Sequence, residues 1–522
     1  MKKLEKFFLN GILLTTCSVL MRTVAVSFNI YVAQKAGAEA MGLYSLLTGI
    51  YGFALTMALS GLHLAVTKLV AEALALDHRA AALKIVRHAL FYAALFGVAA
   101  MTLLHFSAEL IAERWLHDLR AQRPLKLLSL TLPLISASSV INGYFSAVRR
   151  VYKSALSQAL EMSIKILATV LLFQRVLLRN AETVCLLLVG GSAMAELCVF
   201  VINLVLWLFD KVRHLKPTGA RLLAGSVDRK ILGISLPVAL ASYVRSALIS
   251  VEHAMIPSGL IKKGLSYKES LSQYGTVAGM ALPVINFPYA LIGSFAALLI
   301  PEVAESRAKK ENRHLTYITY RTYQFCLVLS LCLCGIFLLF GRMLGRILYD
   351  SEEAGRYIRA LALLVPVMYL DTATDSILKG LGEQLYCMKV NIADACLSVF
   401  LVFLCVPRAG IAGYILAIYI TEIFNASLSI ARVFRLLPAR IPIGKFILAP
   451  VLSALGAGAI VHIPLFLQIS LKEESVCLSG ILLFLALYFL LARLTGAFSK
   501  EDMKWLKTVF SRTPPHESHV KM

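Results

Sequence analysis

The sequence predicts an all-α polytopic membrane protein with about fourteen transmembrane helices. Of its 522 residues, 59% are hydrophobic and only 16% are charged, and the mean hydropathy is +0.76. A soluble domain is usually about a quarter charged. Apolar runs of about 18 residues or more recur from one end of the chain to the other, and each is long enough to cross a bilayer. The chain is therefore expected to cross the membrane many times.

Hydropathy and loop composition place the individual helices. The expected spans are 8–33, 43–66, 88–110, 127–147, 154–173, 183–209, 231–256, 274–302, 317–340, 360–378, 390–406, 410–431, 446–468 and 476–492. Lys and Arg are roughly twice as frequent on one set of alternate connections as on the other. This bias predicts a multi-pass protein of the bacterial plasma membrane with both termini in the cytoplasm.

The basic character of the chain fits topology better than nucleic-acid binding. The formal net charge is +22, but the basic residues lie in short connections between apolar runs, and no soluble basic face accompanies them. The ten cysteines fall mostly inside apolar runs, which favours packed, reduced thiols. We therefore expect no nucleic-acid partner, no metal and no cofactor.

Several short patterns recur at nearly one offset. Val70-Ala71-Glu72 returns as Val303-Ala304-Glu305, and Pro133 returns as Pro366, both at an offset of 233. The run 114–118 matches 346–350 at 232, and Arg22 matches Arg245 at 223. These matches predict two parallel six-helix repeats, a construction common among transporters. The expected parts are an N-terminal lobe (1–210), a cytoplasmic basic linker (211–230), a C-terminal lobe (231–440), two additional helices (441–495) and a cytoplasmic tail (496–522).

Two arginines lie near the middle of expected spans. Arg22 is in the first helix and Arg245 in the seventh. Ionisable groups at this depth are costly and usually face a cavity or a partner. A guanidinium stays charged and its planar fork suits phosphate, so two of them facing one cavity would bind a diphosphate. The structural alternative is that each pairs with a carboxylate of a neighbouring helix.

Acidic and amide side chains form a second group inside expected spans. Pairs that share a helix face lie on the tenth, eleventh and twelfth helices. The candidates for a polar cavity or a coupling site are Glu196, Glu252, Asp371, Asp375, Asn391, Asp394, Glu422 and Asn425. They would bind a cation or sugar hydroxyls, or they would form hydrogen bonds that hold helices together. Glu161 and Lys165, which share a face of the fifth helix, are expected to form a structural ion pair.

The expected helix 274–302 is rich in proline. Pro283, Pro288 and Pro301 each remove a backbone donor, and such kinks are tolerated at membrane depth where protein or a watery cavity compensates. The sequence predicts a bent helix here.

Six stretches resemble one known family. They are Ala38–Tyr44, SGLHLAVTKLVAE (60–72), SQALE (157–161), YGTVAGMALPVINFP (274–288), VPVMYLDTATDSILKGLGEQ (365–384) and GIAGYILAIYITEIFNASLSIARVFRL (410–436). In them the chain is similar to stage V sporulation protein B-like members of the polysaccharide-export and oligosaccharide flippase family, within the multidrug/oligosaccharidyl-lipid/polysaccharide superfamily. The resemblance implies two six-helix lobes in a V-shaped arrangement plus two C-terminal helices.

The resemblance also implies a function. It implies alternating-access movement of an undecaprenyl-diphosphate-linked saccharide, such as the peptidoglycan precursor lipid II, to the outer leaflet for cell-wall synthesis during sporulation. By position, Arg22 and Arg245 would inherit the diphosphate contact. Relatives often carry a further cavity arginine in the second helix, whereas none lies between Leu43 and Val66 here.

The expected function is therefore a flippase and not an enzyme. Expected partners are the lipid-linked saccharide and the bilayer, with Na⁺ or H⁺ coupling and contacts to cell-wall synthesis enzymes left open. The alternatives are a cation-coupled multidrug exporter of the same superfamily, a prenyl-diphosphate transferase that uses Asp371 and Asp375, and a non-transporting cell-wall scaffold.

Overall fold

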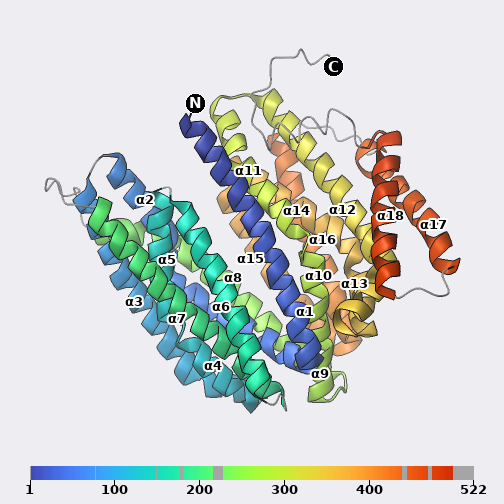
Figure 1. Ribbon diagram of the computed structural model, residues 1–522, viewed down its shortest axis with the longest axis horizontal. Coiled ribbons are helices and arrows are strands. Elements are labelled where there is room, and N and C mark those ends of the chain that lie inside the picture. The colour runs from blue at the N-terminus through green and yellow to red at the C-terminus, as the bar shows by residue number, and fades with distance from the viewer. Residues whose placement is uncertain are drawn as a thin grey trace. The chain divides into compact units, whose positions relative to one another are not determined.

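Every regular element that the structure describes is a helix (Figure 1). The computed structural model describes residues 2–76, 78–148, 150–176, 180–214, 227–437, 444–467 and 473–497. Within these ranges, twelve stretches are long and apolar enough to cross a membrane. Many apolar side chains on them are exposed, such as Phe106 at 79%, as expected for surfaces that contact lipid. The all-α polytopic fold is confirmed, and fourteen remains an approximate number of crossings.

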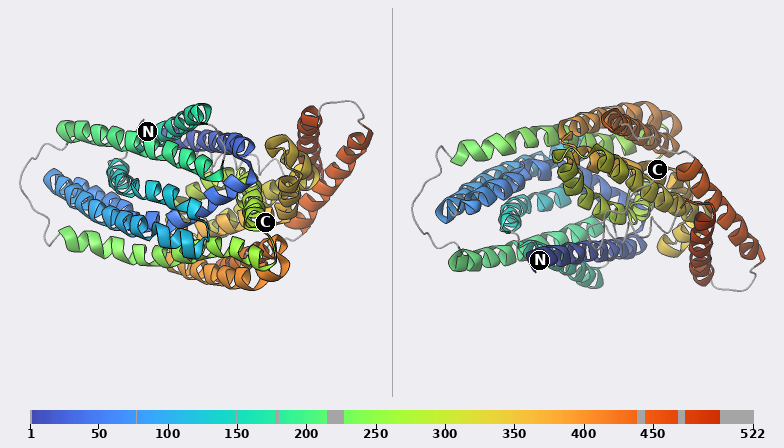
Figure 2. Two further views of the ribbon diagram at one scale, coloured as in Figure 1. Left: turned by 90° about the horizontal axis from the view of Figure 1, so that it is seen from below. Right: turned by 90° about the horizontal axis from the view of Figure 1, so that it is seen from above.

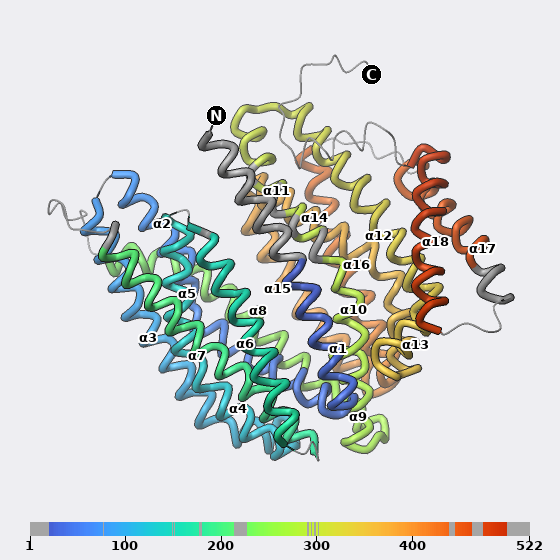
Figure 3. Tube along the Cα trace, viewed as in Figure 1, coloured from blue at the N-terminus to red at the C-terminus, as the bar shows by residue number. Residues whose placement is uncertain are grey.

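Among the described residues, the first half of the chain contains seven α-helices, one short π-helix (η1) and one short 3-10 helix (η2). They are α1 (Lys2–Leu59), α2 (Leu62–Ala75), α3 (Arg79–Leu110), η1 (Ile111–Trp115), η2 (Leu119–Ala121), α4 (Gln122–Ser129), α5 (Leu132–Ala147), α6 (Val151–Arg175) and α7 (Ala181–His214). The long helices α6 and α7 lie side by side (Figure 3).

The second half continues with a similar series and ends with two further helices. It consists of α8 (Val227–Lys262), α9 (Tyr267–Gly275), η3 (Thr276–Ala281), α10 (Leu282–Asn286), α11 (Tyr289–Ala308), α12 (Asn312–Tyr349), α13 (Glu352–Leu361), η4 (Ala362–Leu364), α14 (Val365–Gly380), α15 (Gln384–Ala409) and α16 (Ile411–Leu436). The additional elements are η5 (Gly444–Leu448), α17 (Ala449–Leu467) and α18 (Glu473–Leu494).

Helix boundaries confirm the internal repeat. The starts of α3 and α12, of α5 and α14, and of α6 and α15 all keep the offset of 233, and α5 and α14 are both 16 residues long. Pro133 and Pro366 both stand in the first turn of their helices, where a missing N–H costs least. His117 and Asp350, related by the same offset, both have a positive φ, at 52° and 50°. The two halves therefore share local backbone geometry as well as sequence.

Two expected helices are interrupted. The span 43–66 breaks between α1 and α2, where Ser60 and Gly61 have φ values of 43° and 68°. The span 274–302 is divided among α9, η3, α10 and α11. The chain leaves the helix between α10 and α11, at Phe287 and Pro288, because Pro288 lacks the N–H that would continue it. Conversely, α1 runs on through the expected loop after residue 33, with non-helical geometry at Gly37. The stretch Leu20–Ala75 would be about 84 Å long as one straight helix, so it accounts for two crossings.

The chain forms two compact units. Unit 1 comprises Met1–Ile30, Met280–Asp394 and Ile415–Met522, and unit 2 comprises Tyr31–Gly279 and Ala395–Tyr414. Because neither unit is continuous in sequence, the expected lobes 1–210 and 231–440 stay predictions. Of the expected linker 211–230, residues 215–226 lie outside the described residues, as do residues 498–522 of the expected tail.

Unit 2 has its core where α2, α3 and α5 pack together (Figure 1). Small side chains permit close approach, since a Cβ at Gly143 would lie 2.9 Å from the carbonyl oxygen of His63. In unit 1, α17 and α18 pack on α12, as both views of Figure 2 show. There the ring of Phe484 fills the space beside Gly335, and the ring of Phe340 fills the space beside Gly480.

Candidate functional site

The two central arginines are exposed and unpaired within the described part of the chain. Arg245 lies midway between Val227 and Lys262, the two ends of its span. Arg22 lies near the middle of the first part of α1, before the break at Gly37. Both side chains are exposed, and no described carboxylate forms an ion pair with either guanidinium. The expected structural pairing with a neighbouring carboxylate is therefore absent among the described residues.

Packing of α8 explains why Arg245 is left exposed. On one face of α8, Ser250 donates to the carbonyl of Gly49 at 2.7 Å and Thr56 donates to the hydroxyl of Ser246 at 3.1 Å. Tyr243, on the same face, donates to the carbonyl of Met57 at 3.3 Å. At about 100° per residue, Arg245 projects about 200° away from Tyr243. The face that carries the charge is thus the one that α1 does not cover.

Arg22 and Arg245 belong to different compact units. Arg22 is in unit 1 and Arg245 is in unit 2. The expectation that they share one chamber stays a prediction.

Four of the expected acidic residues come together in unit 1. Asp375 of α14, Glu422 of α16 and Asp394 of α15 are each close enough to act electrostatically on Asp371 of α14. Lys379 forms an ion pair of 3.2 Å with Asp375. One carboxylate oxygen of Asp371 and one of Asp375 are buried without a hydrogen-bond partner. The cluster therefore holds more acceptor oxygens than Lys379 satisfies.

The two amides expected beside this cluster behave differently. Asn391 donates to the carbonyl of Cys387 on its own helix at 2.8 Å. Asn425 is buried, 8% exposed, and its side-chain oxygen has no hydrogen-bond partner. Asn425 therefore keeps an unused acceptor in a buried position.

The expected ion pair on α6 is wrong. Glu161 and Lys165 do not approach to ion-pair distance, and the hydrogen-bonding neighbour of Glu161 is instead Glu196 of α7. Lys165 still acts electrostatically on both carboxyl groups. The helical spacing of four is compatible with a pair but does not fix it, because tightly packed α6 and α7 bring a competing group into reach.

Glu252 lies near two buried tyrosines of unit 2. It acts electrostatically on Tyr274 and Tyr414, whose ring centroids are 6.4 Å apart. Its neighbour His253 forms a short hydrogen bond with the hydroxyl of Tyr274. Glu252 thus belongs to unit 2, whereas the four clustered acids belong to unit 1.

A close crossing in unit 2 was not expected from the sequence. A Cβ at Gly42 would lie 2.1 Å from the carbonyl oxygen of Leu271, and one at Gly275 would lie 2.1 Å from that of Ala38. Positions 42 and 275 are related by the repeat offset, as are 38 and 271, so repeat-equivalent positions meet reciprocally. Each pair has the one-turn spacing that lets helices touch at small side chains. The repeat offset, applied to glycines, was the signal that could have found this contact.

A charged network adjoins this crossing. Arg120 binds the Asp118 carboxylate through two nitrogens at 2.9 and 3.0 Å and pairs with Glu39 at 2.9 Å. The Arg120 guanidinium lies 5.9 Å from the ring centroid of Tyr267. These residues join η2, α1 and the start of α9 within unit 2, so the network ties together segments of both halves of the sequence.

The start of α9 carries two shifted pKa values. Burial raises the pKa of the Tyr267 phenol well above its ordinary range, and the nearby Asp118 carboxylate acts in the same direction. The hydroxyl and backbone N–H of Ser266 both donate to Glu269, which lowers the pKa of that carboxyl. Ser266 and Glu269 form a capping box that begins α9.

Metal ligation has no support in the described part of the chain. No group of three or more His, Cys, Asp or Glu side chains there is arranged to hold a metal ion. By their chemistry, arginine side chains suit anions, and the carboxyl groups of unit 1 suit protons or hydroxyl groups.

Comparison with known proteins begins with a family and two relatives. Residues 8–249 match the family described as polysaccharide biosynthesis protein. Stage V sporulation protein B of Bacillus subtilis (strain 168) is 24% identical over 513 residues, 96% of this chain and 98% of that protein. Sporulation protein YkvU of the same organism is 21% identical over 360 residues, 69% of this chain and 79% of that protein.

Solved structures give the same fold. The lipid II flippase MurJ in an inward closed conformation matches with a TM-score of 0.70 and 14% identity, over 92% of this chain and 98% of that one. An inward-facing multidrug resistance MATE family transporter of the MOP superfamily matches with a TM-score of 0.66 and 14% identity, over 82% and 98%. The resemblance expected from sequence is confirmed: the chain is similar to stage V sporulation protein B over nearly its whole length, and its residues 8–249 match the polysaccharide biosynthesis protein family.

Proposed function

We propose that this chain is a flippase that moves an undecaprenyl-diphosphate-linked saccharide from the inner to the outer leaflet by alternating access. The proposal rests on the exposed guanidinium groups of Arg22 and Arg245 inside apolar spans, neither of which has a carboxylate partner among the described residues. An unpaired charge at that depth is costly unless water or an anionic ligand meets it. A diphosphate is an anion that two planar guanidinium forks bind well.

The substrate class is supported by the relatives. A protein similar over nearly the whole chain acts in sporulation by its name, and a protein of the same fold is a lipid II flippase. We infer a peptidoglycan precursor such as lipid II, used for the spore cortex, as the cargo. This role places the chain in the bacterial plasma membrane, and the bias of Lys and Arg among its connections favours cytoplasmic termini.

The membrane potential is sufficient to drive this movement. With the cytoplasm negative, transfer of two net negative charges outward gains about 4.6 kcal/mol per 100 mV. Coupling to Na⁺ or H⁺ would add to this gain through the cluster of Asp371, Asp375, Asp394 and Glu422. Contacts with cell-wall synthesis enzymes would then supply or consume the cargo.

Reconstitution in liposomes tests the proposal. Fluorescent lipid II, or a simpler prenyl-diphosphate sugar, is placed in one leaflet, and its accessibility in the other is followed with time. Intact protein should move the lipid. Arg22→Ala and Arg245→Ala should each slow it about ten-fold, the loss of about 1.4 kcal/mol that a charge-assisted hydrogen bond explains.

A matched control removes a different arginine. Arg175 is exposed in the last turn of α6, away from the middle of its span. Arg175→Ala should leave the rate unchanged. If intact, folded protein moves none of the prenyl-diphosphate lipids, the proposal is wrong.

The acidic cluster of unit 1 favours a second candidate, a cation-coupled multidrug exporter. Asp375, Asp394 and Glu422 act electrostatically on Asp371, and one buried oxygen of Asp371 and one of Asp375 lack a hydrogen-bond partner, so these carboxyl groups would take up a coupling proton or cation. This candidate predicts export of cationic dyes from proteoliposomes and loss of export in Asp371→Asn. Dye export without any movement of prenyl-diphosphate lipids would favour the exporter over the flippase.

A further inference from the structure

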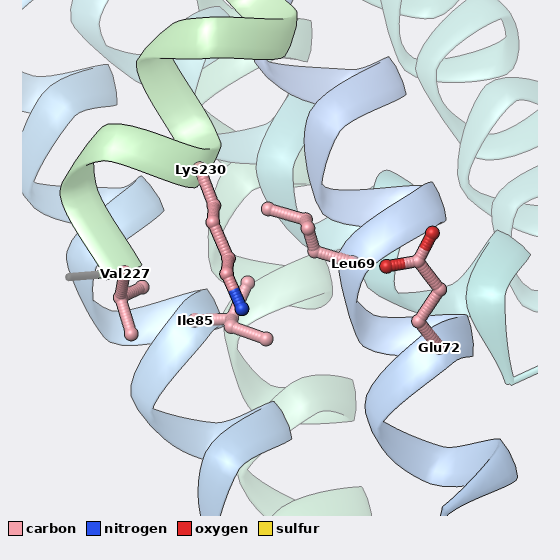
Figure 4. A pocket seen from close by; sticks show the side chains of 5 residues that line it. All are labelled: Leu69, Glu72, Ile85, Val227 and Lys230. Atoms are coloured by element: carbon pink, nitrogen blue, oxygen red, sulfur yellow. The ribbon is translucent and has the colours of Figure 1, made fainter. Parts of the chain in front are cut away.

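A small pocket of unit 2 lies where three spanning segments end. Its lining side chains come from α2, α3 and α8, and the empty space between and beside them, which is open to the surroundings, is about 280 Å³. The lining residues are Leu69, Glu72, Ile85, Val227 and Lys230 (Figure 4). The spans concerned end at Ala75 and begin at Arg79 and Val227, so we expect the pocket at the boundary between hydrocarbon and water.

The pocket presents two opposite charges that do not meet. In the close-up of Figure 4, the side chain of Leu69 stands between the Lys230 ammonium and the Glu72 carboxylate. These two groups form no ion pair with each other, and no other described residue forms one with either of them. A ligand that carries both a positive and a negative group would satisfy both of them at once.

The surroundings keep these two charges unpaired. Asp228, the acid closest in sequence to Lys230, is engaged by the ring of His88 at 2.8 Å. The repeat-equivalent of Glu72 is Glu305, which pairs with Lys309 one turn later at 2.7 Å. One turn after Glu72 the chain has Leu76 instead. The first repeat thus lacks the partner that neutralises this acid in the second.

We propose that this pocket binds the headgroup of a zwitterionic amino-phospholipid, with its phosphate on Lys230 and its ammonium on Glu72. The apolar side chains of Leu69, Ile85 and Val227 contact the glycerol and the first acyl carbons. The site is separate from the proposed diphosphate site, because Glu72 repels a ligand with only negative charge. By the expected topology, it faces the inner leaflet.

Native mass spectrometry of the full-length protein, released from mixed nanodiscs, measures which lipids stay bound. The probes are phosphatidylethanolamine, phosphatidylglycerol and phosphatidylcholine in equal amounts. Intact protein should retain phosphatidylethanolamine in preference to the other two. Phosphatidylglycerol lacks the ammonium, and the quaternary ammonium of phosphatidylcholine donates no hydrogen bond to Glu72.

Two substitutions at Glu72 sharpen this test. Glu72→Gln should lower retained phosphatidylethanolamine about five-fold, the factor expected for a charge pair worth about 1 kcal/mol at a partly exposed site. Glu72→Lys should shift the preference to phosphatidylglycerol, whereas Lys230→Gln should reduce both lipids. Glu72 is exposed, so these variants should fold normally, which thermal unfolding checks.

Two matched controls remove a charge without altering a residue that lines the pocket. Glu305→Gln removes the repeat-equivalent acid, and Lys84→Gln removes a cation from the same end of α3. Neither should change lipid retention. Equal retention of all three lipids by intact protein, or unchanged retention in Glu72→Gln, overturns the proposal. Displacement by soluble glycerophosphoethanolamine at similar concentration overturns the assignment to a lipid.

Discussion

Two ion-pair clasps, which begin at the repeat-related positions Arg150 and Glu383, each tie the start of one helix to the later part of the next, with acid and base on opposite sides. In the first repeat, Asp210 of α7 pairs with Arg150, just before α6, and accepts hydrogen bonds from Lys153 at 2.7 Å and from Tyr144 at 2.9 Å. Here the acid is on the later helix and the bases are on the earlier one.

The second repeat reverses this arrangement. Glu383, the counterpart of Arg150 at the repeat offset, stands just before α15 and accepts hydrogen bonds from Arg432 of α16 at 2.8 and 3.1 Å. The Arg432 guanidinium also lies 5.2 Å from the ring centroid of Tyr386, which is the counterpart of Lys153. The acid is now on the earlier segment and the base is on the later helix.

The comparison indicates that both repeats keep an ion pair between a helix start and the next helix. Which of the two sides carries the acid is not fixed. If these charges served a ligand, exchanging their signs would change what binds, whereas a mechanical tie works with either polarity. Burial separates the two clasps, since the side chain of Asp210 is 3% exposed and that of Glu383 is 19% exposed. The first clasp should therefore be harder to break, because a buried charge left without its partner is costly.

The largest effect is expected at Asp210. Asp210→Asn leaves two cations beside a neutral amide and should lower the free energy of unfolding by about 3 kcal/mol. Denaturant titration in detergent measures this loss. The matched variant Glu383→Gln should lose much less, and equal losses in the two variants would remove the distinction between the clasps.

The second prediction concerns Gly42 and Gly275, where the two repeats make the same close contact. Leucine at either position would overlap a backbone carbonyl, and each substitution should cost about 1–3 kcal/mol of unfolding free energy. Because the two contacts mirror each other, the two losses should be similar. Gly52→Leu is the control, since a Cβ there meets nothing within 4 Å. A large loss in only one of the two variants would contradict the reciprocal packing.

Exchanging the charges of Glu383 and Arg432 tests whether the second clasp works with the acid on either side. Glu383→Arg and Arg432→Glu should each cost about 1 kcal/mol, because both side chains are partly exposed. The double variant should recover most of that loss, as a double-mutant cycle of unfolding free energies would show. Losses that simply add would mean that the site distinguishes the sign of the charge.

The smallest effect concerns a cap that only the second repeat has. The contacts from Ser266 lower the pKa of Glu269, whereas the equivalent first-repeat positions are Ala33 and Ala36. A lowered folded pKa means that the cap stabilises α9 above the ordinary pKa of about 4.5, and that this contribution is lost as pH falls through the folded value. Ser266→Ala should move the Glu269 pKa upward, which NMR titration measures. An unchanged pKa would show that the cap does not act on Glu269.

Much of this fold is predictable from sequence because a membrane span is a local property. Length and hydropathy set each helix, and positions such as Pro133 and Pro366 recur at the repeat offset. The break at Ser60 and Gly61 is not predictable, because serine rarely adopts a positive φ without tertiary packing.

The site was harder to predict for a related reason. Arg22 and Arg245 are conspicuous because charge is rare in apolar runs, and the acids of helices α14 to α16 share helix faces. Partner choice, however, depends on which helices pack together. Glu161 has Glu196 rather than Lys165 as its hydrogen-bonding neighbour, and Arg120 joins Asp118 to Glu39, which is distant in the sequence. The spacing of residues along one helix does not show which neighbouring helix will supply the partner.

The reciprocal fit of Phe484 at Gly335 and Phe340 at Gly480 has a practical consequence. With each ring lodged in the gap left by a glycine on the opposite helix, α18 cannot slide along α12 or rotate about it unless both rings withdraw. A fluorophore attached to the exposed side of α18 would therefore follow the displacement of α12 during turnover. The appended hairpin offers a rigid handle for single-molecule recording.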